Sequence, residues 1–393
     1  MEHTKVKLGE VTKVFNNKRI PLSSNQRKNK KGDFPYYGAQ GVIDNIDEYI
    51  FDGKYILIAE DGANLETRKQ PIARMTKQNE KFWVNNHAHI ITSNEKSVDE
   101  YLYYYINSID IKTHVTGSAQ PKLTKENLLN IELNLPPLEE QKRIADILTA
   151  LDDKIELNNQ MNQTLEEIAS LLYKRWFVDF EFPDDKGNPY KSSGGEMVDS
   201  ELGMIPKGWE VKELGEFITL INGYAFKSGS YSKDGNYKII TIKNVLDNKF
   251  ITNSTNKILE IPDNVIENQK LKIGDVLISL TGNVGRVCVV TEGECLLNQR
   301  VAKIISKIEV NKYYWRTFFN TEEIKIKMIN ISKGTAQSNL STIEIMKIKI
   351  LNSKEVTYNF SEKIKAISKK KLQNEIMILN IEMIKQKLLE ELV

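Results

Sequence analysis

The chain has 393 residues, of which 40% are hydrophobic and 27% are charged, and its 55 lysines and arginines nearly balance its 53 acids. This composition is typical of a folded protein with enough apolar material for two or three domains, and it argues against wholesale disorder. The apolar runs are too short for a membrane span, no secretory signal is visible, and two cysteines cannot form a disulfide framework or a four-cysteine zinc site, so we expect a cytoplasmic protein with no membrane partner.

Residues 1–136 are predicted to form a first globule of mixed helices and strands. Short β-rich runs such as KYILIAE from Lys54 alternate with turn signals, and YLYYYINSI from Tyr101 is typical of a short aromatic-rich helix. The segment from Lys13 to Lys31 contains seven basic residues and no acid. If exposed, such a segment gives a concentrated positive surface suited to a polyanion; the alternative is a solvated, mobile loop.

Residues 137–180 predict one long helix, because the chain continues after Pro136 and Pro137 without Gly or Pro. Asn158 and Asn162 interrupt its apolar stripe, which indicates either a fraying midpoint or a pairing with a specified register and partner. Acids outnumber bases here, so the helix is a poor ligand for nucleic acid. The apolar positions, spaced by four and three as in a coiled-coil seam, are Ile144, Leu148, Leu151, Ile155, Leu165 and Leu172.

The second half of the chain predicts the same order of parts. Residues 181–207 are rich in Gly, Pro and Ser and read as a linker, residues 208–352 as a second globule, and residues 353–393, which lack Gly and Pro, as a second long helix. We expect the two long helices to pair as an antiparallel coiled coil, and the alternative is that each pairs with a separate protein. The apolar stripe of the second helix, with one irregular step, is Ile364, Ile367, Leu372, Ile376, Leu379 and Met383.

Four sequence cues recur in the same order in both globules. VKLGE from Val6 is echoed by VKELGE from Val211, DGKYILIAEDGAN from Asp52 by IGDVLISLTGNVG from Ile273, and VNNHAHII from Val84 by LNQRVAKII from Leu297. The fourth pair is TGSAQPKL from Thr116 and KGTAQSNL from Lys333. This order indicates an internal duplication. We therefore predict an α+β protein with two similar globules, separated by two long helices and related by an internal pseudo-twofold.

The whole chain resembles the specificity subunits of Type I restriction-modification systems. The stretches that carry the resemblance are LEEQKRIADIL, LLYKRWFVDFEFP, GEMVDSELGMIPKGWEVKELGE and FPYYGAQGVIDNIDEY. The resemblance implies two target recognition domains, a central and a distal conserved helical region, and a DNA target split into two different halves. It also implies that two methyltransferase subunits dock on the helices, and it leaves open whether restriction subunits join them.

Under this reading the chain is not itself an enzyme. It contains no G-x-G-x-x-G, no P-loop and no methyltransferase tetrapeptide, so S-adenosylmethionine, and ATP with Mg²⁺, are expected on the partner subunits. A nuclease-like pattern runs from Asp184 to Lys212, but Asp184 lies in the linker and is not held in place. His87 and His89 have no evident third zinc ligand. The alternative function is a coiled-coil adaptor that binds proteins without DNA specificity.

Residue types that reach base edges or phosphates supply the DNA-contact candidates. The Gly-Ser/Thr-Ala-Gln motif is either a phosphate-approach element or a turn, and Tyr36 and Tyr37 either contact DNA or pack inside. In the first globule the candidates are Arg19, Ser23, Ser24, Arg27, Lys28, Tyr36, Tyr37, Gln40, Asn86, His87, Ser118, Gln120 and Lys122. In the second globule they are Lys227, Ser228, Ser230, Tyr231, Lys243, Asn244, Asn283, Arg286, Gln299, Arg300, Thr335, Gln337 and Asn339.

Overall fold

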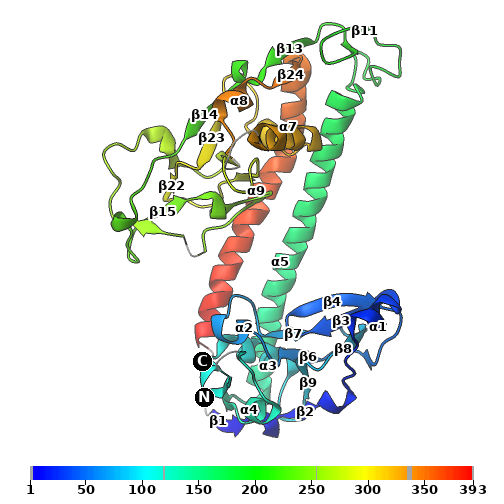
Figure 1. Cartoon of the computed structure of the whole chain (residues 1–393), viewed down its shortest axis with the longest axis vertical. Helices are drawn as coiled ribbons and strands as arrows, with labels where there is room; N and C mark the ends of the chain where they lie inside the picture. The colour runs from blue at the N-terminus through cyan, green and yellow to red at the C-terminus, as the bar shows by residue number, and fades with distance from the viewer. Residues whose placement is uncertain (1–2, 118–119, 254, 334–338, 392–393) are drawn as a thin grey trace. The chain divides into compact units, whose positions relative to one another are not determined.

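The computed structural model describes residues 3–117, 120–253, 255–333 and 339–391, and the candidates Ser118, Thr335 and Gln337 lie outside these ranges. The chain forms two compact units, one of Met1–Glu156 with Asn380–Val393 and one of Leu157–Leu379. Each unit combines a strand-rich globule with one stretch of each long helix, α5 (Leu138–Tyr173) and α9 (Lys354–Glu391) (Figure 1). None of the helices in the described part of the chain has the length and apolar character that a membrane span requires.

The first unit contains two four-stranded sheets and one two-stranded sheet. The first sheet is antiparallel, in the order β2 (Thr12–Val14), β9 (Ala88–Ser93), β6 (Ile56–Ala59) and β7 (Ala73–Met75). The second has the order β4 (Gly41–Ile46), β3 (Lys31–Gly38), β8 (Lys81–Val84) and β5 (Phe51–Asp52), and its central pair β3–β8 is parallel. β1 (Thr4–Lys7) pairs with β10 (Glu132–Leu135) and so ties the start of the globule to its end.

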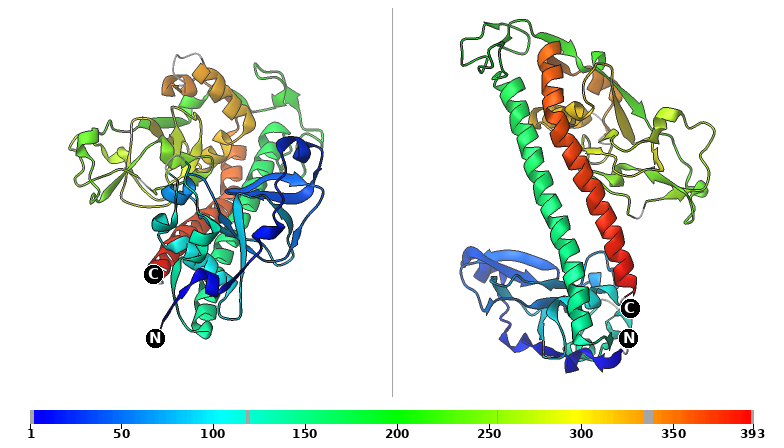
Figure 2. Two further views of the ribbon diagram at one scale, coloured as in Figure 1. Left: turned by 60° about the horizontal axis from the view of Figure 1, so that its bottom comes forward. Right: turned by 180° about the vertical axis from the view of Figure 1, so that it is seen from behind.

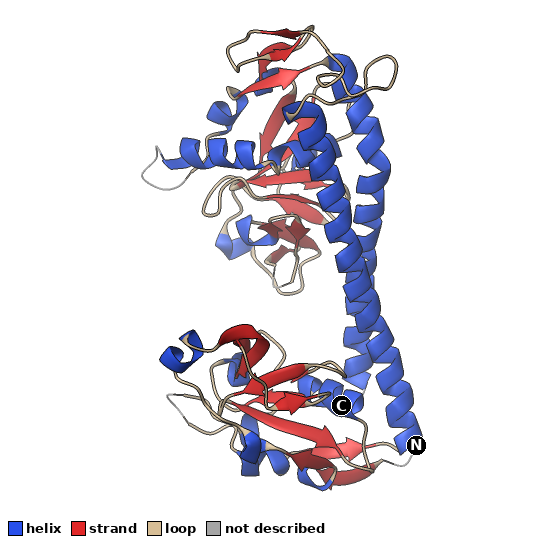
Figure 3. Cartoon of the chain, turned by 90° about the vertical axis from the view of Figure 1, so that its right-hand side faces the viewer, coloured by secondary structure: helices blue, strands red, loops and turns tan. Residues whose placement is uncertain are grey.

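Four helices other than α5 and α9 belong to the described part of the first unit, and α3 supplies much of its core. They are α1 (Ser24–Lys28), α2 (Asn64–Thr67), α3 (Asp99–Ser108) and α4 (Lys125–Leu129). Tyr101, Leu102, Tyr105 and Ile106 on α3 are buried against the strands of the first sheet. Apolar residues spaced by three and four along α3 give this inward face, as expected for a helix that covers a sheet. Figure 3 shows that each globule combines strands with short helices.

The second unit repeats both sheets of the first. Its antiparallel sheet runs β14 (Ile218–Asn222), β23 (Val301–Ser306), β20 (Val276–Ser279) and β21 (Val287–Val289). Its mixed sheet runs β18 (Lys257–Ile258), β15 (Tyr237–Ile240), β22 (Cys295–Leu297) and β19 (Lys270–Leu271), again with a parallel central pair, β15–β22. The remaining elements are the pairs β13 (Glu210–Glu213) with β24 (Lys349–Asn352) and β16 (Val245–Leu246) with β17 (Lys249–Phe250), and the helices α6 (Tyr313–Phe319), α7 (Glu322–Lys333) and α8 (Thr342–Met346).

The registers of the paired strands confirm the duplication predicted from the sequence. Val84 on β8 pairs with Tyr37 on β3, and its counterpart Leu297 on β22 pairs with Ile240 on β15. These are the residues that the aligned stretches VNNHAHII and LNQRVAKII placed together. The two globules therefore share one α+β fold, including the order and direction of the strands in both four-stranded sheets.

The segment expected to be a linker, residues 181–207, is folded onto the second unit. It contains the strand pair β11 (Met197–Val198) and β12 (Ile205–Pro206). Phe182 is 7% exposed and stacks on Tyr190, with ring centroids 4.7 Å apart, and it also packs against Trp209. Ser192, Ser193 and Gly194 lie in a turn of this segment, while its aromatic residues hold it in place.

Within each unit the stretches of α5 and α9 lie side by side and run antiparallel (Figures 1 and 2). In the second unit Asn374 Nδ2 donates to Asn162 Oδ1 at 3.0 Å, and Lys371 Nζ contacts Glu166 Oε2 at 2.5 Å, so a step forward along α5 is a step back along α9. In the first unit Lys385 contacts Asp152 at 2.5 Å. The prediction of an antiparallel helix pair is confirmed.

The seam of α5 follows the predicted spacing. Leu148 is 1% exposed, Asn158 1% and Asn162 9%, so the two asparagines lie inside the seam rather than at a frayed midpoint. The other predicted positions are partly buried: Ile144, Leu151, Ile155, Leu165 and Leu172.

The seam of α9 differs from the prediction in its second half. Ile364 is buried, but Met383 is 58% exposed while Ile381 is 8% exposed. The prediction was wrong because it counted apolar residues alone and therefore stepped from Ile367 to Leu372. Leu372, Ile376 and Leu379 flank the seam, partly buried. The observed seam keeps the steps of four and three by including two buried polar residues, Lys371 and Asn374. Its residues are Phe360, Ile364, Ile367, Lys371, Asn374, Ile378, Ile381 and Lys385.

Candidate nucleic-acid interface

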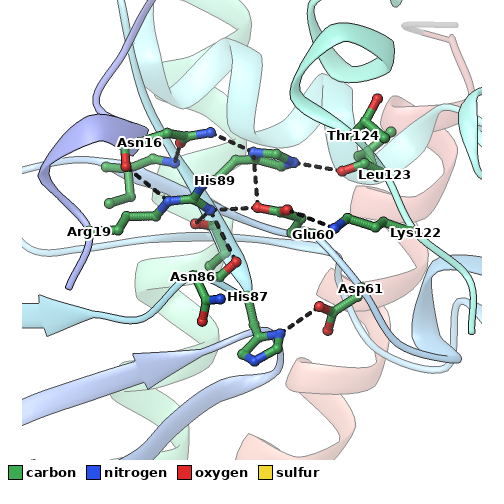
Figure 4. A network of polar contacts seen from close by, with 12 residues as sticks. Asn16, Arg19, Glu60, Asp61, Asn86, His87, His89, Lys122, Leu123 and Thr124 are labelled. Carbon is green, nitrogen blue, oxygen red and sulfur yellow. Dashed lines mark hydrogen bonds and ion pairs between the residues drawn. The ribbon is translucent and has the colours of Figure 1, made fainter. Parts of the chain in front are cut away.

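Three segments of the first unit meet at the carboxyl end of β6. Asp61, two residues beyond β6, forms an antiparallel bridge with Lys122, and the backbone N–H of Glu60 donates to the carbonyl of His87, which directly precedes β9. We call Asp61, His87 and Lys122 the first junction (Figure 4). The backbone contacts fix three polar side chains from distant parts of the sequence beside one another.

Arg19 lies next to this junction. It belongs to a group of hydrogen-bonded residues that supports the junction, Asn16, Arg19, Glu60 and His89, which we call the framework. Its guanidinium donates to Glu60 Oε2 at 2.5 Å and to the carbonyls of Asn86 and Ala88 at 3.2 and 3.0 Å (Figure 4). Its side chain is only 16% exposed. Its donors join the basic segment to the residues around β6 and β9, which favours a structural role for Arg19 over base reading.

His89 is a neutral, buried part of the same framework. Nε2 lies 2.7 Å from the carbonyl of Leu123 and Nδ1 lies 2.8 Å from Asn16 Nδ2, which makes Nε2 the protonated nitrogen and Nδ1 the acceptor. Burial lowers the pKa of His89 below 6.5, which favours this neutral form. Burial alone would raise the pKa of Glu60, but the Arg19 hydrogen bond and the nearby positive charges hold it below its usual value.

Side chains that can reach a ligand lie on the outer side of the framework. The His87 ring is 49% exposed and its Nδ1 lies 2.5 Å from Asp61 Oδ2. The Lys122 side chain is 52% exposed and its Nζ lies 3.4 Å from Glu60 Oε1. The exposed candidates nearby are Gln40, Asn86 and Gln120.

Several other candidates of the first unit make contacts within the globule, and two are exposed. Tyr36 is 1% exposed and its hydroxyl accepts from the backbone N–H of Leu22 at 2.8 Å, so it packs inside and does not contact DNA. Arg27 lies over the Tyr36 ring and pairs with Asp44 at 3.2 Å, and the Tyr37 hydroxyl donates to Glu80 at 2.6 Å. Ser23 caps the N-terminus of α1, and Ser24 and Lys28 are exposed.

The basic segment from Lys13 to Lys31 presents less positive charge than its sequence suggests. Four of its seven cations pair with acids that lie later in the chain: Arg19 with Glu60, Arg27 and Lys31 with Asp44, and Lys30 with Glu48. Lys13, Lys18 and Lys28 remain exposed. A charge count along the sequence cannot reveal such pairing, because the partner acids lie outside the segment, on β4 and in the loops that follow β4 and β6.

The second unit has a matching junction. Thr281, two residues beyond β20, bridges Asn339, and the backbone N–H of Leu280 donates to the carbonyl of Arg300, which directly precedes β23. We call Thr281, Arg300 and Asn339 the second junction. These side chains, with Gln299, line a hollow of about 660 Å³.

The remaining candidates of the second unit differ widely in exposure. Asn244 is 4% exposed and donates to the carbonyl of Ile251 and to Thr255 Oγ1, both at 2.8 Å, so it is a structural residue and not a DNA contact. The oxygen of the Asn283 amide, oriented as an acceptor, lies 3.0 Å from Arg286 Nη2. Lys227, Ser228, Ser230 and Lys243 are exposed, and Tyr231 is partly buried.

Comparison with known proteins identifies the family. A family model described as the Type I restriction modification DNA specificity domain matches residues 2–167 and 206–351, most of both globules. The chain belongs to this family. The chain is 29% identical over 307 residues to the Type I restriction enzyme HindI specificity subunit of Haemophilus influenzae, with 65% of this chain and 67% of the relative covered.

Two further relatives extend over nearly the whole chain. The MjaVIII specificity subunit of Methanocaldococcus jannaschii is 26% identical over 386 residues, which cover 92% of this chain and 85% of the relative. The crystal structure of a Type I restriction-modification S subunit from M. genitalium matches with a TM-score of 0.63 at 12% identity, covering 99% of this chain and 96% of that one, and so shares the fold.

Within this specificity-subunit fold, sequence reasoning missed Glu60, Asp61 and Thr281. Both acids were visible in the stretch IAEDGAN, which belongs to one of the four repeated cues, but acids were not among the candidate residue types. Here they orient cations and a histidine: Glu60 holds Arg19 and Lys122, and Asp61 holds His87. The signal that could have found them is the repeat itself, which marks the same turn in both halves.

Proposed function

We propose that this chain reads a bipartite DNA target, one half with each unit, and so gives sequence specificity to a Type I restriction-modification complex. The observation that carries the proposal is the pair of junctions, which occupy the same place in one duplicated fold but present different side chains. The first junction offers an acid, a histidine and a lysine, and the second a hydroxyl, an arginine and an amide. Different donors and acceptors on equal scaffolds favour two different half-targets.

The chemistry of the complex is assigned to partner subunits. We propose that two methyltransferase subunits dock on the chain, that each flips one adenine out of the duplex, and that each methylates its N6 from S-adenosylmethionine. Exposed apolar residues on α5, including Ile147 at 41% and Leu171 at 67% exposure, support docking on the helices. Restriction subunits that use ATP with Mg²⁺ are a further proposed partner, and the complex would act on DNA in the cytoplasm.

Methylation mapping tests this function. The chain is co-expressed with its methyltransferase partner, and methylated adenines are mapped across the genome of cells with and without the chain. We expect one split, asymmetric sequence that is methylated only when the chain is present. A chain whose removal leaves the methylated positions unchanged, or whose complex binds random duplexes equally well, would refute the proposal.

The strength of binding should also depend steeply on salt. Exposed lysines such as Lys13 and Lys28 supply phosphate contacts that release counterions. We expect the affinity of the complex for its target to fall steeply between 50 and 200 mM salt, roughly 10-fold or more for every few phosphate contacts. An affinity that does not change with salt would contradict a DNA-binding role.

A further inference from the structure

The two junctions are equivalent residue by residue: Asp61 corresponds to Thr281, His87 to Arg300 and Lys122 to Asn339. The residue directly before β9 or β23 is His87 or Arg300. Its carbonyl accepts a hydrogen bond from the backbone N–H of the first residue beyond β6 or β20, at 2.9 and 3.0 Å. In both units the residue two positions beyond β6 or β20 forms a β-bridge with a residue of the loop that precedes α4 or α8. The backbone therefore presents His87 and Arg300 from the same place in each fold.

Both side chains are available for a ligand. His87 is 49% exposed, and Arg300 is exposed and lines the hollow of about 660 Å³. Within the described ranges no ion pair holds the Arg300 guanidinium, whereas Arg19, Arg27 and Arg316 are all paired with acids. A free, exposed guanidinium beside a hollow keeps all its donors for an outside partner.

The second junction holds one more unused polar group. Thr281 Oγ1 is buried and finds no hydrogen-bond partner among the described residues, although Thr281 lines the same hollow as Arg300. A buried hydroxyl without a partner costs free energy, and this one lies beside the hollow that Arg300 lines.

We infer that Arg300 and His87 are specificity-determining residues at equivalent steps of the two half-targets, a proposal that rests on the DNA-reading function above. Arg300 donates two parallel hydrogen bonds to O6 and N7 of a guanine in the major groove. His87 donates Nδ1–H to Asp61, which leaves Nε2 as an acceptor for the amino group of adenine or cytosine. Asp61 is a positioning residue that fixes the tautomer and orientation of His87.

Substitution of each residue in the full chain, co-expressed with its methyltransferase partner, tests this inference. Arg300→Ala should relax one position of one half-target, a guanine in the wild type, by roughly 5- to 150-fold in discrimination, and leave the other half-target unchanged. His87→Ala should relax one position of the other half-target. Lys243→Ala, which removes an exposed cation of the second unit, is the matched control and should weaken methylation equally at all sites without changing the sequence read.

The role of Asp61 has its own readout. Asp61→Asn should relax the same position as His87→Ala, and the double variant should relax it no further than His87→Ala alone, because both changes act through one ring. A merely structural role would instead lower methylation at every site. Thermal unfolding of each variant checks that the fold is kept.

The outcomes separate this inference from the general function. If the wild-type complex reads a bipartite target and both Arg300→Ala and His87→Ala leave it unchanged, the assignment of these residues is overturned while the DNA-reading function stands. If the wild-type complex reads no sequence, the function itself is lost. A half-target that lacks guanine at the position relaxed by Arg300→Ala would also overturn the assignment.

Discussion

Removal of the Glu166 charge should destabilise the second unit strongly. Glu166 on α5 accepts from Arg316 on α6 and from Lys371 on α9, the latter at 2.5 Å, and so joins three helices. The side chains of both cations are only 7% exposed. Glu166→Gln keeps the size of the side chain but removes its charge, which leaves two buried cations close together.

The magnitude follows from how completely these charges are buried. Burial alone would raise the pKa of Glu166, yet the two cations hold it below its usual value, so the carboxylate is ionised and paired. Loss of one partner from a buried ion cluster costs about 3 to 5 kcal/mol. Glu375, 3.8 Å from Lys371, offsets only part of this cost, because burial raises its own pKa. We therefore expect a loss of about 3 kcal/mol or more.

Denaturant unfolding of the full chain measures this loss. Glu167→Gln is the matched control, because Glu167 is exposed on the same helix turn and accepts a hydrogen bond from the neighbouring Gln163 amide. It should change the free energy of unfolding by less than about 0.5 kcal/mol. In a double-mutant cycle, Lys371→Met should cost less in the Glu166→Gln background than alone, since it then removes an unpaired cation. Equal unfolding midpoints for Glu166→Gln and Glu167→Gln would refute the reasoning.

Three further predictions concern the helix seam and the histidine framework. Ile381→Ala should lower the free energy of unfolding by about 2 to 4 kcal/mol, and Met383→Ala, at an exposed position nearby, by less than about 1 kcal/mol. Thermal or denaturant unfolding measures both, and a larger loss for Met383→Ala would support the seam predicted from the sequence instead. Asn162→Leu leaves the Asn374 amide buried without its partner and should cost about 1 to 3 kcal/mol, whereas adding Asn374→Leu should recover stability; no recovery would count against the pairing. Because burial lowers the pKa of His89 below 6.5, the unfolded chain takes up the proton first, so this contribution to stability is full above about pH 6.5 and declines as the pH falls; His89→Gln should flatten that decline in unfolding curves between pH 7 and 5, and an unchanged slope would contradict it.

The architecture could be predicted from the sequence because it rests on signals that repeat. Leu8 and Leu214 both begin an LGE turn, and each donates its backbone N–H to the far end of its own globule, at Ile131 and Ile348. The long helices were equally visible, since a helix without Gly or Pro needs only local information. The duplication predicted that the two globules share one fold, because each sequence cue in one half has a counterpart in the other.

The register of α9 could not be predicted because polar residues occupy its seam. Lys371 and Asn374 are 5% and 1% exposed, and each is tolerated only because a partner on α5 satisfies it. A prediction from apolar periodicity alone skips these positions, and its seam residues fall one or two residues beyond the observed ones. Buried polar pairs of this kind fix which residues of two helices meet, so the feature that misled the prediction is also the one that specifies the pairing.

The same limit applies to the DNA-contact candidates. Arg19, Tyr36 and Asn244 have the residue types that read bases, yet each has turned inward and uses its donors and acceptors within the globule. His87 and Arg300 have the same types and face outward. Sequence gives the capacity to hydrogen-bond, whereas the acids and carbonyls that pair with these side chains are brought beside them only by the fold. A residue type is therefore evidence for recognition only when its polar atoms are exposed and not already bonded within the described part of the protein. Arg300 meets this condition and Arg19 does not, although both are arginines.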